Sequence, residues 1–286
     1  NGFLVLTPSL AVSMLNNGNA VLSPGGSSAW DQNIWSYGVT KVGGKYYMYY
    51  ASGSQPGLDT DKDIGLATST DGITFTKFSS NPVLTNGAFT TASNPVPYYN
   101  GSWHMYYTAN DGGVGSSRDM DAMYAYSSDG ENWTKYASNP IIANGNPNQV
   151  WDGLQVMTEC ILNESGNYKL YYTGDNGNTG DWQAGLATSS DGVTWTKNGN
   201  NPVHTGNAAT WDKGDSKINS IQKANGTYRA FVTGDWNSPK VGWAWSKDGV
   251  NWQDSGSALI SRKAGTIYSI SIGNPKVIDE GDHYKL

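Results

Sequence analysis

The sequence predicts an all-β fold, a single five-bladed β-propeller that spans residues 1–286 as one domain. The first observation is the run Ser-x-Asp-Gly-x-x-aromatic, repeated at spacings of 58, 62 and 57 residues from Ser69, Ser127, Ser189 and Ser246. The second is an alternating, mostly Tyr-rich run before each copy, and the third is a partial copy at each end of the chain. Self-similarity at a nearly fixed period is the sequence mark of a repeat architecture.

Each repeat contains four strand signals in the same order. The first strands end in Gly turns, at Gly44, Gly101, Gly166 and Gly226. The second strands are the alternating runs from Lys45, Ser102, Asn167 and Thr227. The third strand ends at the Ser of the repeated run, and the fourth follows its aromatic residue. Four short antiparallel strands joined by turns make one propeller blade.

The repeated run itself has a structural explanation. An Asp side chain accepts backbone N–H bonds in a tight turn, and Gly adopts the positive φ that the turn requires. The aromatic residue is then expected to pack beneath the turn. We therefore assign the four aspartates of the runs to the fold and exclude them from catalysis; they are Asp71, Asp129, Asp191 and Asp248.

The two ends of the chain together supply the fifth repeat. The C-terminal stretch from Gly273 corresponds to the first half of a blade and stops inside its second strand. The stretch from Thr7 to Leu22 matches Ser69 to Leu84 in length and in its apolar positions. We therefore expect the last blade to be closed by both termini, which removes exposed strand edges and locks the ring.

Composition excludes several classes of function. Only 15% of the residues are charged and the net charge is −6, so no basic surface is expected for binding nucleic acid. Cys160 is the only cysteine, which excludes an intrachain disulfide and a Cys-based zinc site. No apolar run approaches the roughly 18–20 residues of a membrane span. The low charge and the many Asn, Gly, Ser and Thr residues favour a secreted or surface-associated protein.

Loop lengths distinguish the two faces of the predicted disc. Long loops follow the second strands, beginning at Ser52, Ala109, Gly174 and Gly234, whereas the opposite face carries short Gly turns. Long loops on one face of a rigid scaffold usually mark the binding face. Trp182 and Trp236 lie in two of these loops and are candidates for an aromatic platform under a ring-shaped ligand; local packing is the alternative.

The start of three repeats carries the dipeptide Trp-Asp, which contributes Asp31, Asp152 and Asp212. A feature found in three blades favours a structural role, but one copy can have been adapted to a functional role.

Alignment of the innermost strands by their Gly turns places one residue of each blade at the channel mouth. These residues are Tyr37, Asn94, Glu159, Asn219 and Asn274. Glu159 alone is ionisable, and a lone carboxylate beside Cys160 and Ile161 suits a general acid. The alternative is a Glu that is hydrogen-bonded to the neighbouring blades for structural reasons.

With five repeats, the Ala-Thr-Ser-x-Asp-Gly runs and the segments GKYYMYY and GNYKLYY, the whole chain resembles the five-bladed glycosidases of glycoside hydrolase families 43, 32 and 68. The resemblance implies an axial pocket with three acidic residues from the first three blades: a base or nucleophile, an auxiliary Asp and a Glu acid. Glu159 on the third blade matches the acid. The other two positions depart from the family 43 pattern, which commonly opens with Asp-Pro, because this chain has Tyr37-Gly38 and Asn94-Pro95.

The leading hypothesis is therefore a glycoside hydrolase acting on a poly- or oligosaccharide, with Glu159 as the acid. Because cleavage requires a second carboxylate, we take Asp31 as the base and keep Asp152, Asp212 and Asp215 in reserve. Arg118-Asp119 is similar to an Arg-Asp-Pro element of family 32, but it lacks the Pro and lies in a loop. The candidate substrate-binding residues are Tyr37, Asn94, Trp182, Trp236, Asp152, Asp212 and Asn219.

Two further classes of function stay open. Tyr37 and Asn94, where the resemblance leads one to expect acids, favour a non-catalytic glycan-binding or adhesion propeller. A purely structural interaction propeller is the third hypothesis, and the sequence does not indicate an oligomeric state.

No cofactor is expected to be required, and no metal site is assigned. The stretch Asp59-x-Asp61-x-Asp63 resembles the start of a calcium loop, but the Gly and the distal Glu of that motif are missing. His104, His204 and His283 lie far apart in the sequence without metal-ligand spacing. Calcium at this loop or at the axis is therefore only a secondary hypothesis.

Overall fold

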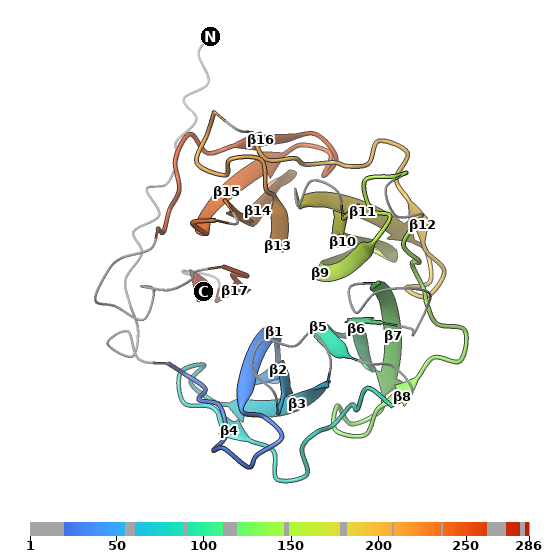
Figure 1. Ribbon diagram of the computed structural model, residues 1–286, viewed down its shortest axis with the longest axis vertical. Coiled ribbons are helices and arrows are strands. Elements are labelled where there is room, and N and C mark those ends of the chain that lie inside the picture. Colours follow the sequence, from blue (N-terminus) through green and yellow to red (C-terminus); the bar gives the residue numbers. More distant parts are fainter. Residues whose placement is uncertain are drawn as a thin grey trace.

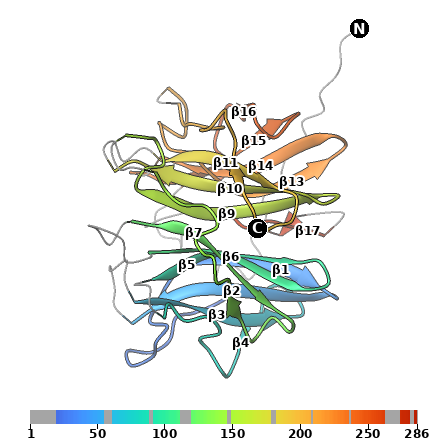
Figure 2. The ribbon, with the colours of Figure 1, turned by 90° about the vertical axis from the view of Figure 1, so that its right-hand side faces the viewer.

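The computed structural model describes residues 20–54, 61–87, 91–110, 119–145, 149–177, 182–207, 209–235, 237–261, 273–280 and 284–285. The regular elements in these ranges are all β-strands, and four four-stranded sheets stand around a central axis as the blades of a propeller (Figure 1). Figure 2 shows the same blades from the side. Among the described residues, no helix has the length and apolarity to cross a membrane.

Each blade is an antiparallel meander whose strands follow the chain order. Blade 1 contains β1 (Asn33–Val42), β2 (Lys45–Gly53), β3 (Lys62–Ser69) and β4 (Thr76–Lys77), and blade 2 contains β5 (Ala92–Tyr99), β6 (Trp103–Ala109), β7 (Asp121–Ser127) and β8 (Thr134–Lys135). Blade 3 contains β9 (Gln155–Glu164), β10 (Asn167–Asp175), β11 (Gln183–Ser189) and β12 (Thr196–Lys197), and blade 4 contains β13 (Lys217–Ala224), β14 (Thr227–Gly234), β15 (Lys240–Ser246) and β16 (Trp252–Asp254). The first strands β1, β5, β9 and β13 contact one another in sequence and line the axis.

The described residues form four complete blades, not the five that the sequence predicts. The remaining strands, β17 (Ile278–Asp279) and β18 (Tyr284–Lys285), form a two-stranded sheet between blade 4 and blade 1 (Figure 1). Of the N-terminal stretch expected to complete this blade, residues 7–19 lie outside the described residues. The all-β propeller fold is therefore shown, and the fifth blade stays a prediction.

The Asp-Gly turns have the structure that the repeat predicts. In blade 3, Asp191 Oδ1 accepts the N–H groups of Val193 at 2.8 Å and Thr194 at 2.7 Å, and Gly192 has a φ of 77°. The same backbone hydrogen bonds recur in the other blades and hold the pKa of all four turn aspartates below the ordinary value. The assignment of these aspartates to the fold is confirmed.

A tyrosine from each of three blades fastens that blade to the Asp-Gly turn of the next. These hydroxyls donate to glycine carbonyls, Tyr49 to Gly130 at 2.7 Å, Tyr106 to Gly192 at 2.9 Å and Tyr171 to Gly249 at 2.8 Å. The three tyrosines are fully buried, so each bond lies in a setting where an unpaired polar group is costly. We call these three bonds the tyrosine latch.

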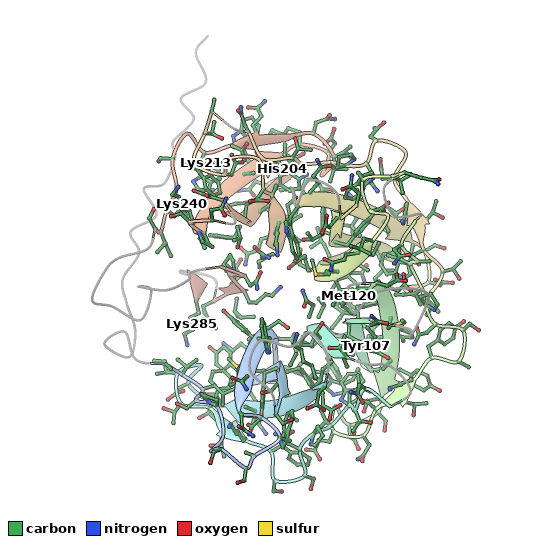
Figure 3. All side chains as sticks on the ribbon, in the orientation of Figure 1. Tyr107, Met120, His204, Lys213, Lys240 and Lys285 are labelled. Carbon is green, nitrogen blue, oxygen red and sulfur yellow. The ribbon has the colours of Figure 1, made fainter. Side chains whose placement is uncertain are left out.

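We expect Tyr106→Phe to lower the free energy of unfolding by about 1–2 kcal/mol, because it leaves the buried Gly192 carbonyl without this hydroxyl donor. The matched control is Tyr107→Phe in the same strand of blade 2 (Figure 3). Tyr107 is also buried, but its hydroxyl has no hydrogen-bond partner among the described residues, so its loss should be neutral or stabilising. Denaturant unfolding measures both; equal destabilisation by the two variants would contradict the latch.

Candidate functional site

All four inner strands carry a β-bulge near their start. The register shifts between Ile34 and Ser36 in β1, between Ser93 and Val96 in β5, around Glu159 in β9 and between Ile218 and Ser220 in β13. A bulge takes one residue out of the strand ladder and re-aims its side chain. The bulged residues are Trp35, Asn94 with Pro95, Glu159 and Asn219. Three of the residues that the sequence aligned at the axis, Asn94, Glu159 and Asn219, thus lie in bulges of the inner strands.

Glu159 is 2% exposed and is held at the axis by both carboxylate oxygens. Oε1 accepts from the Thr173 hydroxyl of its own blade at 2.8 Å, and Oε2 accepts from the Asn219 amide of blade 4 at 2.8 Å. The ammonium of Lys276 lies 3.7 Å from Oε2. Glu159 also lines a channel cavity of about 180 Å³ between the inner strands. The carboxylate is therefore fixed in place, beside one positive charge, at the edge of a cavity.

The hydrogen-bond network continues from Asn219 to the C-terminal segment. The Asn219 amide also donates to Asn274 Oδ1 at 3.1 Å, and its own Oδ1 accepts from the Thr233 hydroxyl at 2.7 Å. Lys276 donates to the main-chain carbonyls of Glu159 at 2.7 Å and Asn219 at 3.0 Å. The structure therefore brings Glu159, Asn219 and Asn274 together, as the alignment of inner strands predicted.

Asn94 joins the same region from blade 2. It adopts a positive φ of 47°, and its carbonyl accepts from the hydroxyl of Thr158, the residue before Glu159, at 2.7 Å. Its N–H donates to the Ser36 hydroxyl of blade 1 at 2.9 Å. Asn94 thus connects the inner strands of blades 1, 2 and 3 beside Glu159.

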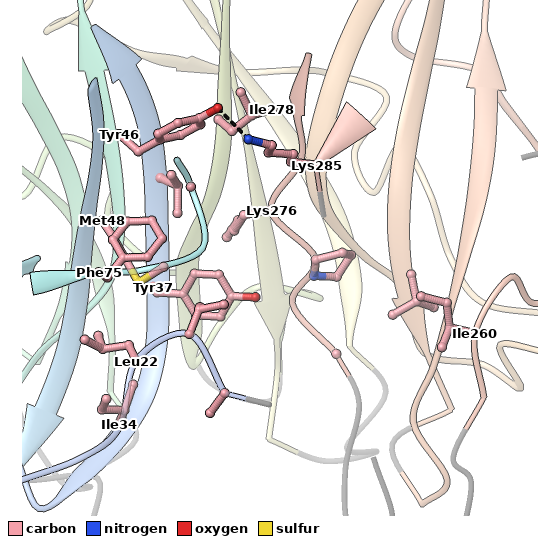
Figure 4. A pocket seen from close by; sticks show the side chains of 17 residues that line it. Leu22, Ile34, Tyr37, Tyr46, Met48, Phe75, Ile260, Lys276, Ile278 and Lys285 are labelled. Carbon is pink, nitrogen blue, oxygen red and sulfur yellow. Dashed lines mark hydrogen bonds between the residues drawn. The ribbon is translucent and has the colours of Figure 1, made fainter. Parts of the chain in front are cut away.

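Tyr37 lies in a different environment. It pairs in register with Tyr50 and lines an apolar cavity of about 400 Å³ between blade 1 and the C-terminal segment (Figure 4). Because the β1 bulge occurs before Tyr37, the alignment by Gly turns did not identify the bulged residue of blade 1. That residue is Trp35, which no sequence signal singled out.

Charged and aromatic groups gather where β13 begins. The Lys217 ammonium lies 3.5 Å from the centre of the Trp182 ring, and Asp215 Oδ1 accepts the Trp182 N–H at 3.1 Å. Burial lowers the pKa of Lys217 to about 8, although the charges of Glu159, Asp215 and Asp175 act to raise it. Trp182, predicted as a platform, thus lies against a cation whose charge also interacts with Glu159.

Asp31, the predicted base, is part of a separate network. It is 4% exposed, accepts from the Lys77 ammonium at 2.5 Å and accepts from the Tyr50 hydroxyl at 3.2 Å. Both partners belong to its own blade.

The other two Trp-Asp aspartates are similarly engaged. Asp152 accepts from Lys197 at 2.6 Å in the arrangement of Asp31, and Asp212 accepts the Asn207 N–H at 3.0 Å. All three side chains therefore make contacts that fix the start of a blade.

Several predicted residues lie outside the described part of the chain. These are Trp236, Arg118, Asp59 and His283. Within the described residues, no three His, Cys, Asp or Glu side chains converge as a metal site. His104 contacts Tyr124 at 2.7 Å, and His204 contacts Asp254 at 2.9 Å.

Comparison with known sequences identifies the family. Residues 88–269 match the glycosyl hydrolases family 32 N-terminal domain, and this range contains Glu159, Lys217 and Asn219. The match covers more than half of the 286 residues. The chain belongs to this family.

A second comparison finds a relative of similar sequence. The chain is 26% identical over 199 residues to MT1551, an uncharacterized protein of Mycobacterium tuberculosis (strain CDC 1551 / Oshkosh). The alignment covers 67% of this chain, which spans only 64% of that relative.

Solved structures of glycosidases superpose on the propeller. A protein of the GH130 family of mannoside phosphorylases and glycoside hydrolases matches with a TM-score of 0.65 at 18% identity, over 90% of this chain and 84% of its own. Zg3597, a family 117 glycoside hydrolase of Zobellia galactanivorans, matches with a TM-score of 0.62 at 21% identity, over 85% and 76%. A thermostable family 43 glycoside hydrolase matches with a TM-score of 0.62 at 18% identity, over 80% and 74%. At these identities the likeness shows the fold alone.

The depressed pKa of Lys217 gives this family 32 chain a testable pH dependence. The folded-state pKa of about 8 lies below the ordinary 10.5. Below pH 8 the folded and the unfolded state both carry the proton on Lys217, and its desolvated charge opposes folding. Between pH 8 and 10.5 only the unfolded state keeps the proton, so the free energy of unfolding rises with pH. Lys217→Met removes this contribution. Its stability relative to wild type should therefore fall between pH 7 and pH 10, as measured by denaturant unfolding.

The control for Lys217→Met is Lys213→Met in the same segment, whose side chain is mostly exposed. The Lys213 variant should follow the pH dependence of wild type. An identical pH dependence for Lys217→Met and wild type would contradict the lowered pKa of Lys217.

Proposed function

We propose that the protein is a glycoside hydrolase acting on a poly- or oligosaccharide, with Glu159 as the proton donor. One observation carries the proposal: of the bulged residues at the axis, Glu159 alone is ionisable, and it lines the channel cavity. The family 32 match and the glycosidase-like propeller support the same class of reaction. In the family this chain resembles, the acid is a Glu of the third blade.

Cleavage of a glycoside requires a second carboxylate, which activates water or attacks the anomeric carbon. Asp31 stays the base predicted from the sequence, but its contacts with Lys77 and Tyr50 favour a role in the fold. Asp215 is the stronger candidate on geometry. It lies beside Trp182, and its charge acts on the same Lys217 as the charge of Glu159.

A specific observation favours a second function, a non-catalytic glycan-binding propeller. Both oxygens of Glu159 accept hydrogen bonds from Thr173 and Asn219, and the equivalent bulges of blades 2 and 4 hold Asn94 and Asn219 rather than acids. An amide-lined axis of this kind provides donors and acceptors for sugar hydroxyls without an acid–base pair.

Glu159→Gln should lower kcat about 10²–10⁴-fold, because the amide cannot donate a proton to the leaving oxygen. The assay is product analysis on a broad set of oligosaccharides. The matched control is Glu164→Gln at the other end of β9, which breaks ion pairs with Lys169 and Lys223 and should leave kcat unchanged. Full activity of Glu159→Gln would remove Glu159 from the mechanism. Binding without turnover by the wild type would favour the second function.

Asp31→Asn and Asp215→Asn discriminate between the two candidate bases. We expect Asp31→Asn to lower the free energy of unfolding by about 1–3 kcal/mol, because it removes the charge of a buried carboxylate that pairs with Lys77, and to keep kcat. We expect Asp215→Asn to lower kcat with a smaller change in unfolding. Thermal unfolding and initial rates on one substrate measure both effects. A loss of kcat confined to Asp31→Asn would instead support the base predicted from the sequence.

We also propose that β17 and β18 are the inner half of a fifth blade completed by the N-terminal stretch. Contacts between blades 3 and 4 provide the comparison. Glu164 at the end of β9 accepts from the Tyr228 hydroxyl of blade 4 at 2.7 Å and from the Lys223 ammonium of that blade. Lys169 of β10 donates to the carbonyl of the turn residue Asp248 at 3.3 Å and to the Tyr228 hydroxyl at 2.6 Å.

The same four kinds of contact join β17 and β18 to blade 1. Glu280, next to β17, accepts from the Tyr46 hydroxyl and the Lys41 ammonium of blade 1. Lys285 of β18 donates to the carbonyl of the turn residue Asp71 at 2.7 Å, and also to the Tyr46 hydroxyl at 2.9 Å (Figure 4). Since β17 and β18 contact blade 1 as β9 and β10 contact blade 4, this equivalence supports the five-bladed ring.

A further inference from the structure

Trp35 is an unusual residue of the inner strand of blade 1. Its side chain is 44% exposed, and of the tryptophans that the structure describes it alone is exposed. Single exposed apolar side chains are normal on proteins and need no function. Trp35 differs because it is a bulged residue of an inner strand, as Glu159 is in blade 3.

The position of the bulge determines how far Trp35 lies from Glu159 along the axis. In blade 3 the bulge lies opposite Tyr171 and Tyr172, whereas in blade 1 it lies opposite Ala51 and Ser52. The repeat aligns Tyr171 and Tyr172 with Tyr49 and Tyr50, which lie two residues before Ala51 and Ser52. The β1 bulge is therefore displaced by two residues toward the end of β2. That end of the blade is the face on which the inner strands begin. Trp35 therefore lies at the mouth, above the level of Glu159.

A buried lysine supports the Trp35 ring. The Lys62 ammonium lies 4.1 Å from the centre of the ring, and Lys62 is only 4% exposed. A cation at this distance is attracted to the face of the indole. Lys62 therefore holds the Trp35 ring in one orientation, and the rest of the ring is exposed. An ordered aromatic ring at the edge of a site binds at a lower entropic cost than a mobile one.

The same construction occurs a second time on this face. Lys62 and Lys217 are each the first residue of a strand, β3 and β13, and each lies over a tryptophan ring, Trp35 and Trp182. Two Trp–Lys stacks from different blades thus lie on the face that carries Glu159. The mouth thus presents apolar indole rings, and amide and carboxylate groups lie below it. This combination matches a ligand whose ring is apolar on its faces and hydroxylated at its edges.

We propose that Trp35 forms a sugar-binding subsite at the channel mouth, where the C–H face of a neutral sugar ring stacks on the indole. This inference rests on the proposed function, since it places Trp35 against a sugar unit adjacent to the one bound at Glu159. The ligand is a neutral oligosaccharide of at least two units rather than a monosaccharide. Trp35 contributes to binding and not to proton transfer.

The test measures binding by titration calorimetry in the Glu159→Gln background, which prevents turnover. The probes are neutral gluco-, xylo-, manno- and fructo-oligosaccharides of two to six units. Trp35→Ala should weaken binding of the best probe about fivefold or more, and Trp35→Tyr should restore most of the loss because it retains a ring. The control is Tyr126→Ala, which removes a similarly exposed aromatic ring near the opposite end of blade 2 and should leave the affinity unchanged.

Rates in the otherwise wild-type protein separate this inference from the proposed function. Trp35→Ala should raise KM and leave kcat nearly unchanged. Undiminished affinity and KM in Trp35→Ala, with hydrolysis intact, would overturn the subsite and leave the proposed function standing. A wild-type protein that neither binds nor cleaves any of the probes would overturn both.

Discussion

The tyrosine latch is the interaction on which the ring depends. A blade alone is a small four-stranded sheet, and its apolar faces are buried only when the next blade is held against it. The hydroxyl of Tyr106 reaches the Gly192 carbonyl of the next blade, and a bond there is possible only because the turn before Val193 is fixed by Asp191. The turn aspartates and the latch tyrosines therefore act as one device, with the Asp shaping the acceptor and the Tyr supplying the donor. This explains why the most regular residues of the sequence belong to the fold.

The site is a product of the same packing, because no single blade contains it. Glu159 is oriented by Thr173 from its own blade and by Asn219 from the next, while Lys276 reaches both inner strands from the C-terminal segment. Buried polar groups in such a network must all be satisfied, so each partner restricts the others. The geometry at the axis is thus set by the angle between blades. Displacement of blade 4 would separate Asn219 from Glu159 even if blade 3 stayed intact.

The sequence predicted what repeats and missed what departs from the repeat. Recurrence identified the strands, the turn aspartates and the isolated position of Glu159. The same method misjudged blade 1, because aligning by the Gly turn assumes an equal number of residues to the bulge, and the bulge of β1 falls at Trp35 rather than at Tyr37. The partners of Asp31 and the Lys217–Trp182 stack could not be predicted from the sequence, for another reason. These contacts join residues about 20 to 50 positions apart, and composition does not indicate which lysine approaches which carboxylate or ring.

The departures from the repeat also bear on how the ring closes. Blade 4 has Phe231 at the position of the latch tyrosine Tyr171, so it brings no hydroxyl to the blade that follows. In the alignment of Thr7–Leu22 with the repeat, Ser9-Leu10 stands where the other turns have Asp-Gly. At this step of the repeat the sequence therefore has neither the tyrosine nor the Asp-Gly pair. On the other side of the same gap, Glu280 repeats with Lys41 and Tyr46 the contacts that Glu164 makes between blades 3 and 4. On its blade 1 side, a closing blade would thus be fastened by the ion pair of Glu280 with Lys41 and by the hydrogen bonds of the Tyr46 hydroxyl with Glu280 and Lys285.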